Sequence, residues 1–300
     1  MQASIANIRH QLPLLQAMGK ILHKSLLKSD SGRIPELPTR EAKETIPPRN
    51  RKLVEEFIDH VGGVARSYEG IVPFHMFPQW SLAAGAETYL QLPYNLSKII
   101  NLGCEIEING PLRREEPLII TSRLENVDAT DRRVIITSKV ITETASSPRA
   151  LEANLTAMIP LKATSSKDSG ESSNKKGKQP ERVPHRAQLV DVFNLAKDAG
   201  IEFAVLTGDF NPLHWVPAWA KAMGYKSPIL HGYASMSRLI EVLIKKEFGG
   251  DVSAFKKFNV KFTNPLPIPG KAGVFREGDN RFYLGAAAGG KAYLVGSFEV

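Results

Sequence analysis

Apolar residues in the first half of the chain recur at the spacing of a helix. One such face lies just before Gly62-Gly63, a pair that would end the helix. A second stretch, over residues 79–92, is largely apolar on all sides and predicts a buried helix. The residues of the first face are Leu53, Val54, Phe57, Ile58 and Val61.

Runs that are typical of strands follow the predicted buried helix. They are rich in β-branched and alternating apolar residues and are separated by glycine, proline, aspartate and serine, which favour turns. We therefore expect a run of antiparallel strands. The four runs cover about residues 101–109, 118–127, 134–142 and 151–161.

The second half of the chain repeats this order of elements. A short segment at about 189–199 comes first, then a short helix over 217–223 and a longer apolar helix over 232–248. Strand-like runs follow again, so the pattern predicts two α+β halves. The four later runs cover about residues 255–262, 270–276, 282–288 and 291–300.

Two segments are expected to connect these parts. Residues 164–184 contain a single aliphatic residue, Val183, and no aromatic one, so they cannot bury enough surface to offset the entropy of ordering. A proline-rich link is expected over residues 34–48. The predicted organisation is an N-terminal tail with this link (1–48), a first unit (49–163), a flexible linker (164–186) and a second unit (187–300).

The tail has an unusual charge pattern. Residues 1–29 carry several basic side chains and no acidic one, and apolar residues recur at helical spacing. A basic amphipathic helix can make weak contact with a membrane surface or resemble an organelle transit peptide. The alternative, which we favour, is an additional helix that packs on the body of the protein and is kinked at Pro13.

Composition limits the other classes of protein. The chain of 300 residues is 42% hydrophobic, and its formal net charge is +8. The basic residues are dispersed and belong to no recognisable nucleic-acid module, so we expect no nucleic-acid partner. No apolar run is long enough for a transmembrane segment. The single cysteine, Cys104, fits a reducing compartment, and we expect a cytoplasmic protein.

The candidate chemistry lies in the second half. Asp209, Asn211 and His214 fall within six residues around Pro212, and an Asp/His pair that shares one water is a device for acid–base catalysis. His231-Gly232 opens an apolar helix, and the unpaired amides at a helix start can receive a developing oxyanion. Together these features suggest addition or elimination of water next to a thioester carbonyl.

The segment Gly208-Asp-Phe-Asn-Pro-Leu-His214, with Gly224 and Pro228-Ile-Leu-His-Gly232, resembles the signature of the MaoC-like (R)-specific enoyl-thioester hydratases. This family, also called hydratase 2, has the hotdog fold. The resemblance is clearest over residues 187–300 and implies a double hotdog, with two hotdog units in one chain. The first unit lacks the Asp-x-Asn-Pro-x-His motif, so only the second is expected to be catalytic.

The resemblance also implies roles for individual residues. Asp209 and His214 would be the catalytic pair, Asn211 would support their loop, and the backbone N–H of Gly232 would bind the thioester oxygen. No metal or other cofactor is expected, apart from coenzyme A or phosphopantetheine as part of the substrate. Further candidates for contact with the substrate are His231, Tyr233, Trp215 and His75, although packing roles are open for each.

The predicted function is reversible hydration that interconverts trans-2-enoyl and (R)-3-hydroxyacyl thioesters in fatty-acid metabolism. The acyl carrier would be coenzyme A or acyl carrier protein. A hotdog acyl thioesterase and a non-catalytic acyl-thioester binding protein are the alternatives. Two hotdog units in one chain already form a pseudo-dimer, so both a monomer and a homodimer are compatible with the sequence.

Overall fold

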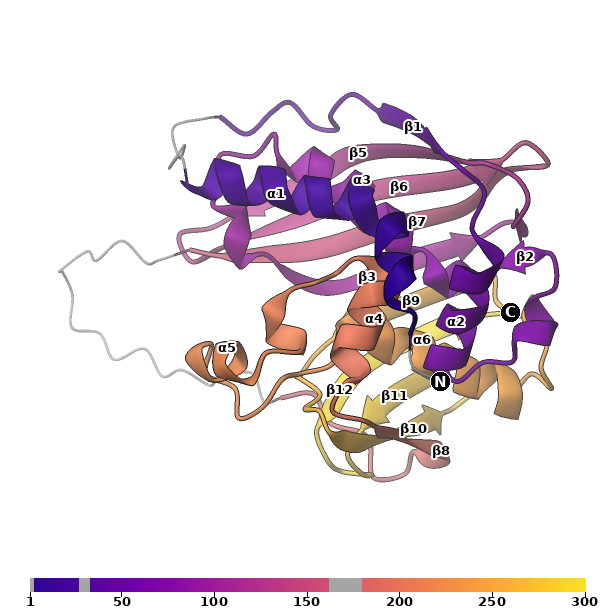
Figure 1. The fold of residues 1–300 in the computed structure, drawn as a ribbon. Helices are drawn as coiled ribbons and strands as arrows, with labels where there is room; N and C mark the ends of the chain where they lie inside the picture. Colours follow the sequence, from indigo (N-terminus) through magenta and orange to yellow (C-terminus); the bar gives the residue numbers. More distant parts are fainter. Residues whose placement is uncertain (1–2, 27–32, 162–179) are drawn as a thin grey trace, which may run out of the picture.

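The computed structural model describes residues 3–26, 33–161 and 180–300. A ten-stranded sheet runs through both halves of the chain, and every neighbouring pair in it is antiparallel. Its strand order is β1-β5-β6-β7-β3-β9-β12-β11-β10-β8. Figure 1 shows the strands of the first half above those of the second.

The first half supplies five strands of this sheet. They are β1 (Ala42–Ile46), β3 (Ile100–Ile108), β5 (Leu118–Ala129), β6 (Arg133–Thr144) and β7 (Ser147–Pro160). Buried and more exposed residues alternate along β5 and β6, as expected for strands with one face on a core. A separate pair, β2 (Ile71–Val72) and β4 (Leu112–Arg113), is also antiparallel.

Helix α3 (Pro78–Tyr89) is the central helix of the first half and lies against β5 and β6. Ten of its twelve residues are buried, which explains why its sequence has no polar face. Helix α2 (Arg51–Val61) ends at Gly62, whose φ of 88° suits glycine. Short 3₁₀ turns occupy Ala65–Tyr68 (η2), Phe74–Met76 (η3) and Leu96–Lys98 (η4).

The second half supplies the other five strands. They are β8 (Gln188–Leu195), β9 (Lys257–Phe262), β10 (Gly270–Glu277), β11 (Arg281–Gly285) and β12 (Ala292–Glu299). The long helix α6 (Gly232–Lys246) contacts β8 and β12 and takes the place that α3 has in the first half. Helices α4 (Ala199–Thr207) and α5 (Pro217–Ala222) and the 3₁₀ turn η5 (Pro212–His214) precede it.

The two halves share a seam and a core. Strand β3 pairs with β9, for example through Cys104 and Val260, so the two sets of strands form one sheet. Helices α2 and α4 pack together, and the rings of Phe57 and Phe203 meet there with centroids 6.2 Å apart. Because one buried cluster spans both halves, they cannot be regarded as independently packed domains.

The N-terminal residues pack on this body, as in the interpretation that we favour. They form η1 (Ile5–Gln11) and helix α1 (Leu12–Leu26), and α1 runs along α3 (Figure 1). Pro13 lies in the first turn of α1, where proline is tolerated, and the segment changes there from the 3₁₀ turn η1 to an α-helix.

Several segments differ from the expected organisation. Residues 42–46, within the predicted proline-rich link, form the edge strand β1 on β5. Helix α4 lies where we expect no helix. The predicted linker lies mostly outside the described residues, but its end is packed: Val183 is buried, and its N–H donates to the carbonyl oxygen of Gly290. Among the described residues, no helix has the length and apolarity required to cross a membrane.

Candidate active site

Asp209 lies at the point where helix α4 ends. Gly208 closes the helix with a φ of 89°, and its N–H donates to the carbonyl oxygen of Ala204. Such a left-handed residue ends a helix sharply, so the chain turns at once into the loop with Asp209. The side chain of Asp209 is 19% exposed, which leaves the carboxylate accessible to a small ligand.

The loop is stabilised by its own side chains. The Asn211 Oδ1 accepts a hydrogen bond from the N–H of Leu213 at 3.1 Å and caps η5, while Pro212 begins that turn. The Trp215 indole N–H donates to the carbonyl oxygen of Phe210 at 3.3 Å. Asn211 and Trp215 therefore hold the shape of the loop, and Trp215 remains 38% exposed beside it.

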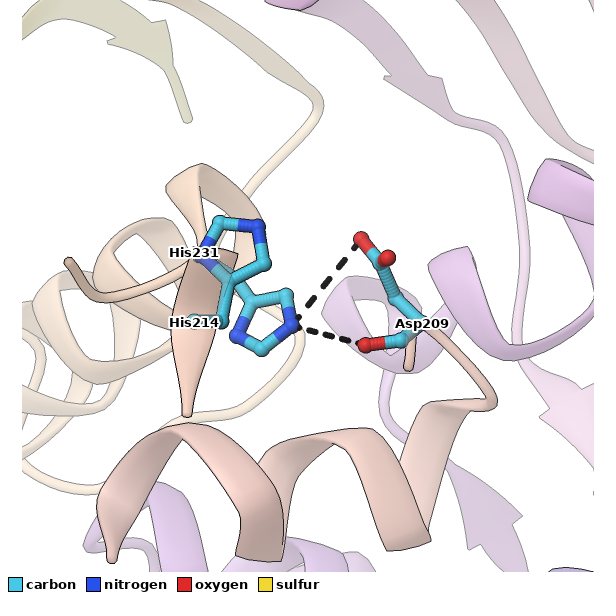
Figure 2. Close-up of side chains that lie close together, drawn as sticks. All are labelled: Asp209, His214 and His231. Atoms are coloured by element: carbon cyan, nitrogen blue, oxygen red, sulfur yellow. Dashed lines mark hydrogen bonds and ion pairs between the residues drawn. The ribbon is translucent and has the colours of Figure 1, made fainter. Parts of the chain in front are cut away.

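His231 contacts Asp209 directly. Its Nε2 lies 2.9 Å from the Asp209 carbonyl oxygen and 4.0 Å from the Asp209 Oδ2 (Figure 2). Because a carbonyl oxygen can only accept, the proton of this hydrogen bond is on Nε2. Burial and the neighbouring His214 lower the pKa of His231 well below its usual value. The ring is therefore neutral near pH 7 and acts as a hydrogen-bond donor to the Asp209 loop.

His214 is held in a defined tautomer by the backbone. Its Nδ1 lies 2.8 Å from the carbonyl oxygen of Ile229, so Nδ1 is the protonated nitrogen of the neutral ring. The lone pair is then on Nε2. The His214 ring stacks on that of His231, with centroids 3.6 Å apart and 28° between the planes. The site thus presents one basic imidazole nitrogen beside one carboxylate.

The same three residues lie close enough together to be considered as metal ligands. One ligand atom from each of Asp209, His214 and His231 lies within 4.8 Å of the others. The lone pair of an imidazole lies in its ring plane, and two stacked rings direct theirs along nearly parallel planes. A tetrahedral ion needs lone pairs that converge on one point. The geometry therefore favours acid–base chemistry, and the absence of a cofactor stays a prediction.

Gly232 is the first residue of α6, next to this cluster. The first amides of a helix have no acceptor within the helix and carry partial positive charge. A Cβ on Gly232 would lie 2.7 Å from the Phe262 ring. The absence of a side chain therefore lets α6 begin in contact with β9, directly after His231, whose ring contacts the loop of Asp209.

Two further candidates from the sequence, Tyr233 and His75, are buried side chains. Tyr233 is 2% exposed, its ring lies between Phe77 and Phe262, and its hydroxyl has no hydrogen-bond partner among the described residues. Burial raises its pKa well above the usual value. The His75 Nε2 lies 3.1 Å from the Glu241 Oε1 and is fully buried. The structure therefore does not bring His75 to the Asp209 cluster.

Helix α4 packs closely on the histidine turn, the 3₁₀ turn η5 that carries His214, and the sequence did not predict this contact. A Cβ on Gly200, in the first turn of α4, would overlap the carbonyl oxygen of His214. Glycine at this position lets the helix that leads to Asp209 touch the turn that carries His214. The unusual Ala199-Gly200 start of the helix was the only sequence signal for this contact.

Comparison with known families supports the motif. Residues 173–276 match the family described as "MaoC like domain", and this range includes Asp209, His214 and Gly232. The chain contains a MaoC-like domain. The expected resemblance is thereby confirmed. The matched range of the MaoC-like domain covers about a third of the chain, all of it after residue 172.

Two curated relatives are similar to the MaoC-like domain. The peroxisomal enoyl-CoA hydratase 2 of Arabidopsis thaliana is 32% identical over 90 residues, which are 30% of this chain and 29% of the relative. The (R)-specific enoyl-CoA hydratase of Aeromonas caviae is 33% identical over 84 residues, 28% of this chain and 60% of that protein. The chain thus spans less than two thirds of each relative.

The fold extends beyond the MaoC-like domain to both halves. The structure of HtdX from Mycobacterium tuberculosis matches 87% of this chain and 99% of its own, with a TM-score of 0.67 and 18% identity. At this identity the likeness shows the fold alone. The α+β double hotdog expected from the sequence is confirmed.

Proposed function

We propose that the protein catalyses the reversible hydration of trans-2-enoyl thioesters to (R)-3-hydroxyacyl thioesters. The observation that carries this proposal is the pairing at the end of α4. There the carboxylate of Asp209 and the imidazoles of His214 and His231 lie together, next to the first amides of α6. The names of the two relatives, enoyl-CoA hydratase 2 and (R)-specific enoyl-CoA hydratase, support the same reaction.

In the hydrating direction, Asp209 and His214 would hold one water between them. The Asp209 carboxylate accepts a hydrogen bond from this water, and the free His214 Nε2 is the second acceptor. The water oxygen adds to the β-carbon and loses a proton to the pair, and the pair returns a proton to the α-carbon. Dehydration is the reverse: the pair removes the α-proton and protonates the leaving hydroxyl.

The other residues would support this step. The N–H of Gly232 would donate to the thioester oxygen, on which negative charge develops when the β-carbon is attacked. His231, neutral because of its burial, would hold the Asp209 backbone through its Nε2 proton without adding a charge to the site. Asn211 and Trp215 would keep the loop in shape.

The proposal includes both coenzyme A and acyl carrier protein as carriers of the acyl group. The formal net charge of +8 suits the phosphates of coenzyme A and also an acidic acyl carrier protein. Trp215, which donates to the Asp209 loop, and the exposed Trp219 of α5 would shape the mouth of the site. Cytoplasmic location stays a prediction, as does the choice between monomer and homodimer.

The test is the loss of the ultraviolet band of an enoyl thioester, with crotonyl-CoA and 2-decenoyl-CoA as substrates. We expect the wild type to consume them and to yield the (R)-3-hydroxyacyl product, and Asp209→Asn to lose this activity. Asp279→Asn, at an exposed position in the β10–β11 turn, is the matched control and should behave as wild type. Release of free thiol without hydration would instead identify a thioesterase.

A further inference from the structure

The N-terminal segment lies across the helices of both halves. Helix α1 packs along α3, and η1 packs against α4, the helix that leads to Asp209. Leu14 and Ala17 are 5% and 0% exposed, so the apolar face of the segment is covered by the body of the protein. This segment precedes the region that matches the MaoC-like domain and is not part of it.

Gln11, the last residue of η1, reaches the end of α4. Its side chain is buried, and its Nε2 donates to the carbonyl oxygens of Val205 and Leu206 at 3.1 and 3.0 Å. The last carbonyls of a helix have no partner within the helix. Gln11 therefore caps the C-terminal end of α4 from outside, at carbonyls that lie three and four residues before Asp209.

The side chains of Gln11 and Leu14 both lie against Gly208, the residue after the last one of α4. A Cβ on Gly208 would lie 3.2 Å from the Gln11 Cβ and 3.2 Å from the Leu14 Cδ2. Both side chains thus contact the residue that directly precedes Asp209. A change in the position of Gln11 would therefore shift the turn at Gly208, which sets the direction of the Asp209 carboxylate.

A chain of side chains fixes the orientation of the Gln11 amide. Arg49 Nη1, which can only donate, donates to the Gln79 Oε1 at 2.8 Å. The Gln79 Nε2 then faces the Gln11 Oε1 at 3.0 Å, and this leaves the Gln11 Nε2 facing α4. Gln79 belongs to α3 and is buried. Each hydrogen bond in this chain is therefore donated in one direction, from Arg49 to Gln79, from Gln79 to Gln11 and from Gln11 to α4. With either amide turned around, two donors or two acceptors would face each other.

We propose that Gln11 is a positioning residue for the reaction. Through its two hydrogen bonds it would fix the C-terminal end of α4, and hence the Asp209 carboxylate relative to His214. The N-terminal segment is then part of the support of the active site. This inference rests on the proposed hydration for its kinetic consequence, although the contact with α4 is independent of that function.

The variant that tests it is Gln11→Met. Methionine has a similar length and keeps the contact with Gly208, but it cannot donate to the two carbonyls. The matched control is Asn7→Leu. Asn7 lies in the same 3₁₀ turn, is also buried, and donates from Nδ2 to the Glu56 Oε2 at 2.6 Å, so it anchors the segment to α2 and not to α4.

Three measurements separate positioning from general loss of stability. In Gln11→Met we expect faster hydrogen exchange of the amides of residues 208–211. We also expect a fall in kcat of about 10-fold to 100-fold with KM within about 2-fold of the wild type, because a small misplacement of a catalytic group has costs of this size. The pH profile of kcat should also shift. Asn7→Leu should change none of the three.

The inference would be overturned by either of two results. In the first, Gln11→Met matches the wild type in exchange, kcat and pH profile. In the second, Gln11→Met and Asn7→Leu lose activity equally, in proportion to their loss of thermal stability and with unchanged pH profiles. If the wild type hydrates no thioester, the proposed function fails, and hydrogen exchange at residues 208–211 still decides whether Gln11 holds the end of α4.

Discussion

The imidazole rings of His214 and His231 stack on each other with their centroids 3.6 Å apart. Each ring also donates to a backbone carbonyl, that of Ile229 for His214 and that of Asp209 for His231. The stack therefore joins the segment before α6 to the loop after α4. Two positive charges at this separation would repel strongly, which agrees with the lowered pKa of the buried His231.

Stability should decrease at acidic pH because of His231. Burial lowers its pKa well below the usual value of 6.5, so below that pH the unfolded chain binds a proton that the folded protein does not. Folding stability is unaffected by this group above about pH 6.5 and falls as the pH drops further, by up to about 1.4 kcal/mol per pH unit. The wild-type Tm should therefore fall between pH 6.5 and pH 5.

His231→Gln, which cannot titrate, should show a shallower fall of Tm over the same range. Burial also lowers the pKa of His10 and of His60, but these groups are present in both proteins and cancel in the comparison. Thermal melts at half-unit steps of pH measure the two slopes. Parallel slopes would mean that His231 does not contribute to the acid sensitivity.

His214→Asn should remove the base and keep the fold. The amide N–H of asparagine can replace the Nδ1 proton that His214 donates to Ile229, but asparagine has no counterpart of Nε2. We expect kcat for hydration to fall by about 10²–10⁴-fold, the usual contribution of a general acid–base group. The control is His23→Gln, at an exposed position on α1. A kcat within threefold of the wild type for His214→Asn would rule out this role.

Most of the strands and the two central helices could be predicted from the sequence. Along β5 and β6 the apolar residues alternate because one face packs on the core, and this period is visible without the structure. Helix α6 has a clear apolar face and a His-Gly start. In these elements the order of apolar and polar residues within the segment itself matches the strand or helix, so this order was sufficient to identify them.

Other elements follow from tertiary contacts and left little local signal. Helix α4 is apolar on nearly all sides because it is enclosed between α2, η1 and the histidine turn, so it shows no helical period. Strand β1 is short and mostly exposed, and it is a strand because β5 offers it an edge. Pairing of this kind depends on a partner far away in the sequence.

The residues of the candidate site also fall into two groups, those that a local motif identifies and those that come together only through long-range contacts. Asp209, Asn211 and His214 could be identified because they lie within one short motif. The contact of His231 with the Asp209 carbonyl and that of Gln11 with Leu206 span 22 and 195 residues. A single sequence holds no spacing rule for contacts of this range, and both residue types are common on protein surfaces.

Gly232→Ala should impair the reaction through Phe262. The new Cβ would lie 2.7 Å from the Phe262 ring, so the start of α6 or the ring has to move. If the Gly232 N–H binds the thioester oxygen, its displacement should lower kcat by about 10²–10³-fold. In the double variant Gly232→Ala/Phe262→Ala the clash is removed, and we expect at least part of kcat to return. A double variant as slow as Gly232→Ala would show that the clash is not the cause.

Glu241→Ala should destabilise the protein without changing substrate binding. The Glu241 Oε1 accepts a hydrogen bond from the Tyr68 hydroxyl at 2.7 Å and lies 3.1 Å from the His75 Nε2, and all three side chains are buried. Removing the carboxyl group leaves the buried Tyr68 hydroxyl without its acceptor, at a cost of about 1–3 kcal/mol in free energy of unfolding. Denaturant titration measures this loss.

Tyr68→Phe is the matched variant for this cluster, because it removes one hydroxyl and keeps the carboxylate beside His75. It should cost about 1–3 kcal/mol, the range for one buried hydrogen bond. In both variants we expect KM for enoyl thioesters to stay within about twofold of the wild type, because His75 lies outside the Asp209 cluster. A tenfold rise in KM with intact stability would instead restore His75 as a substrate contact.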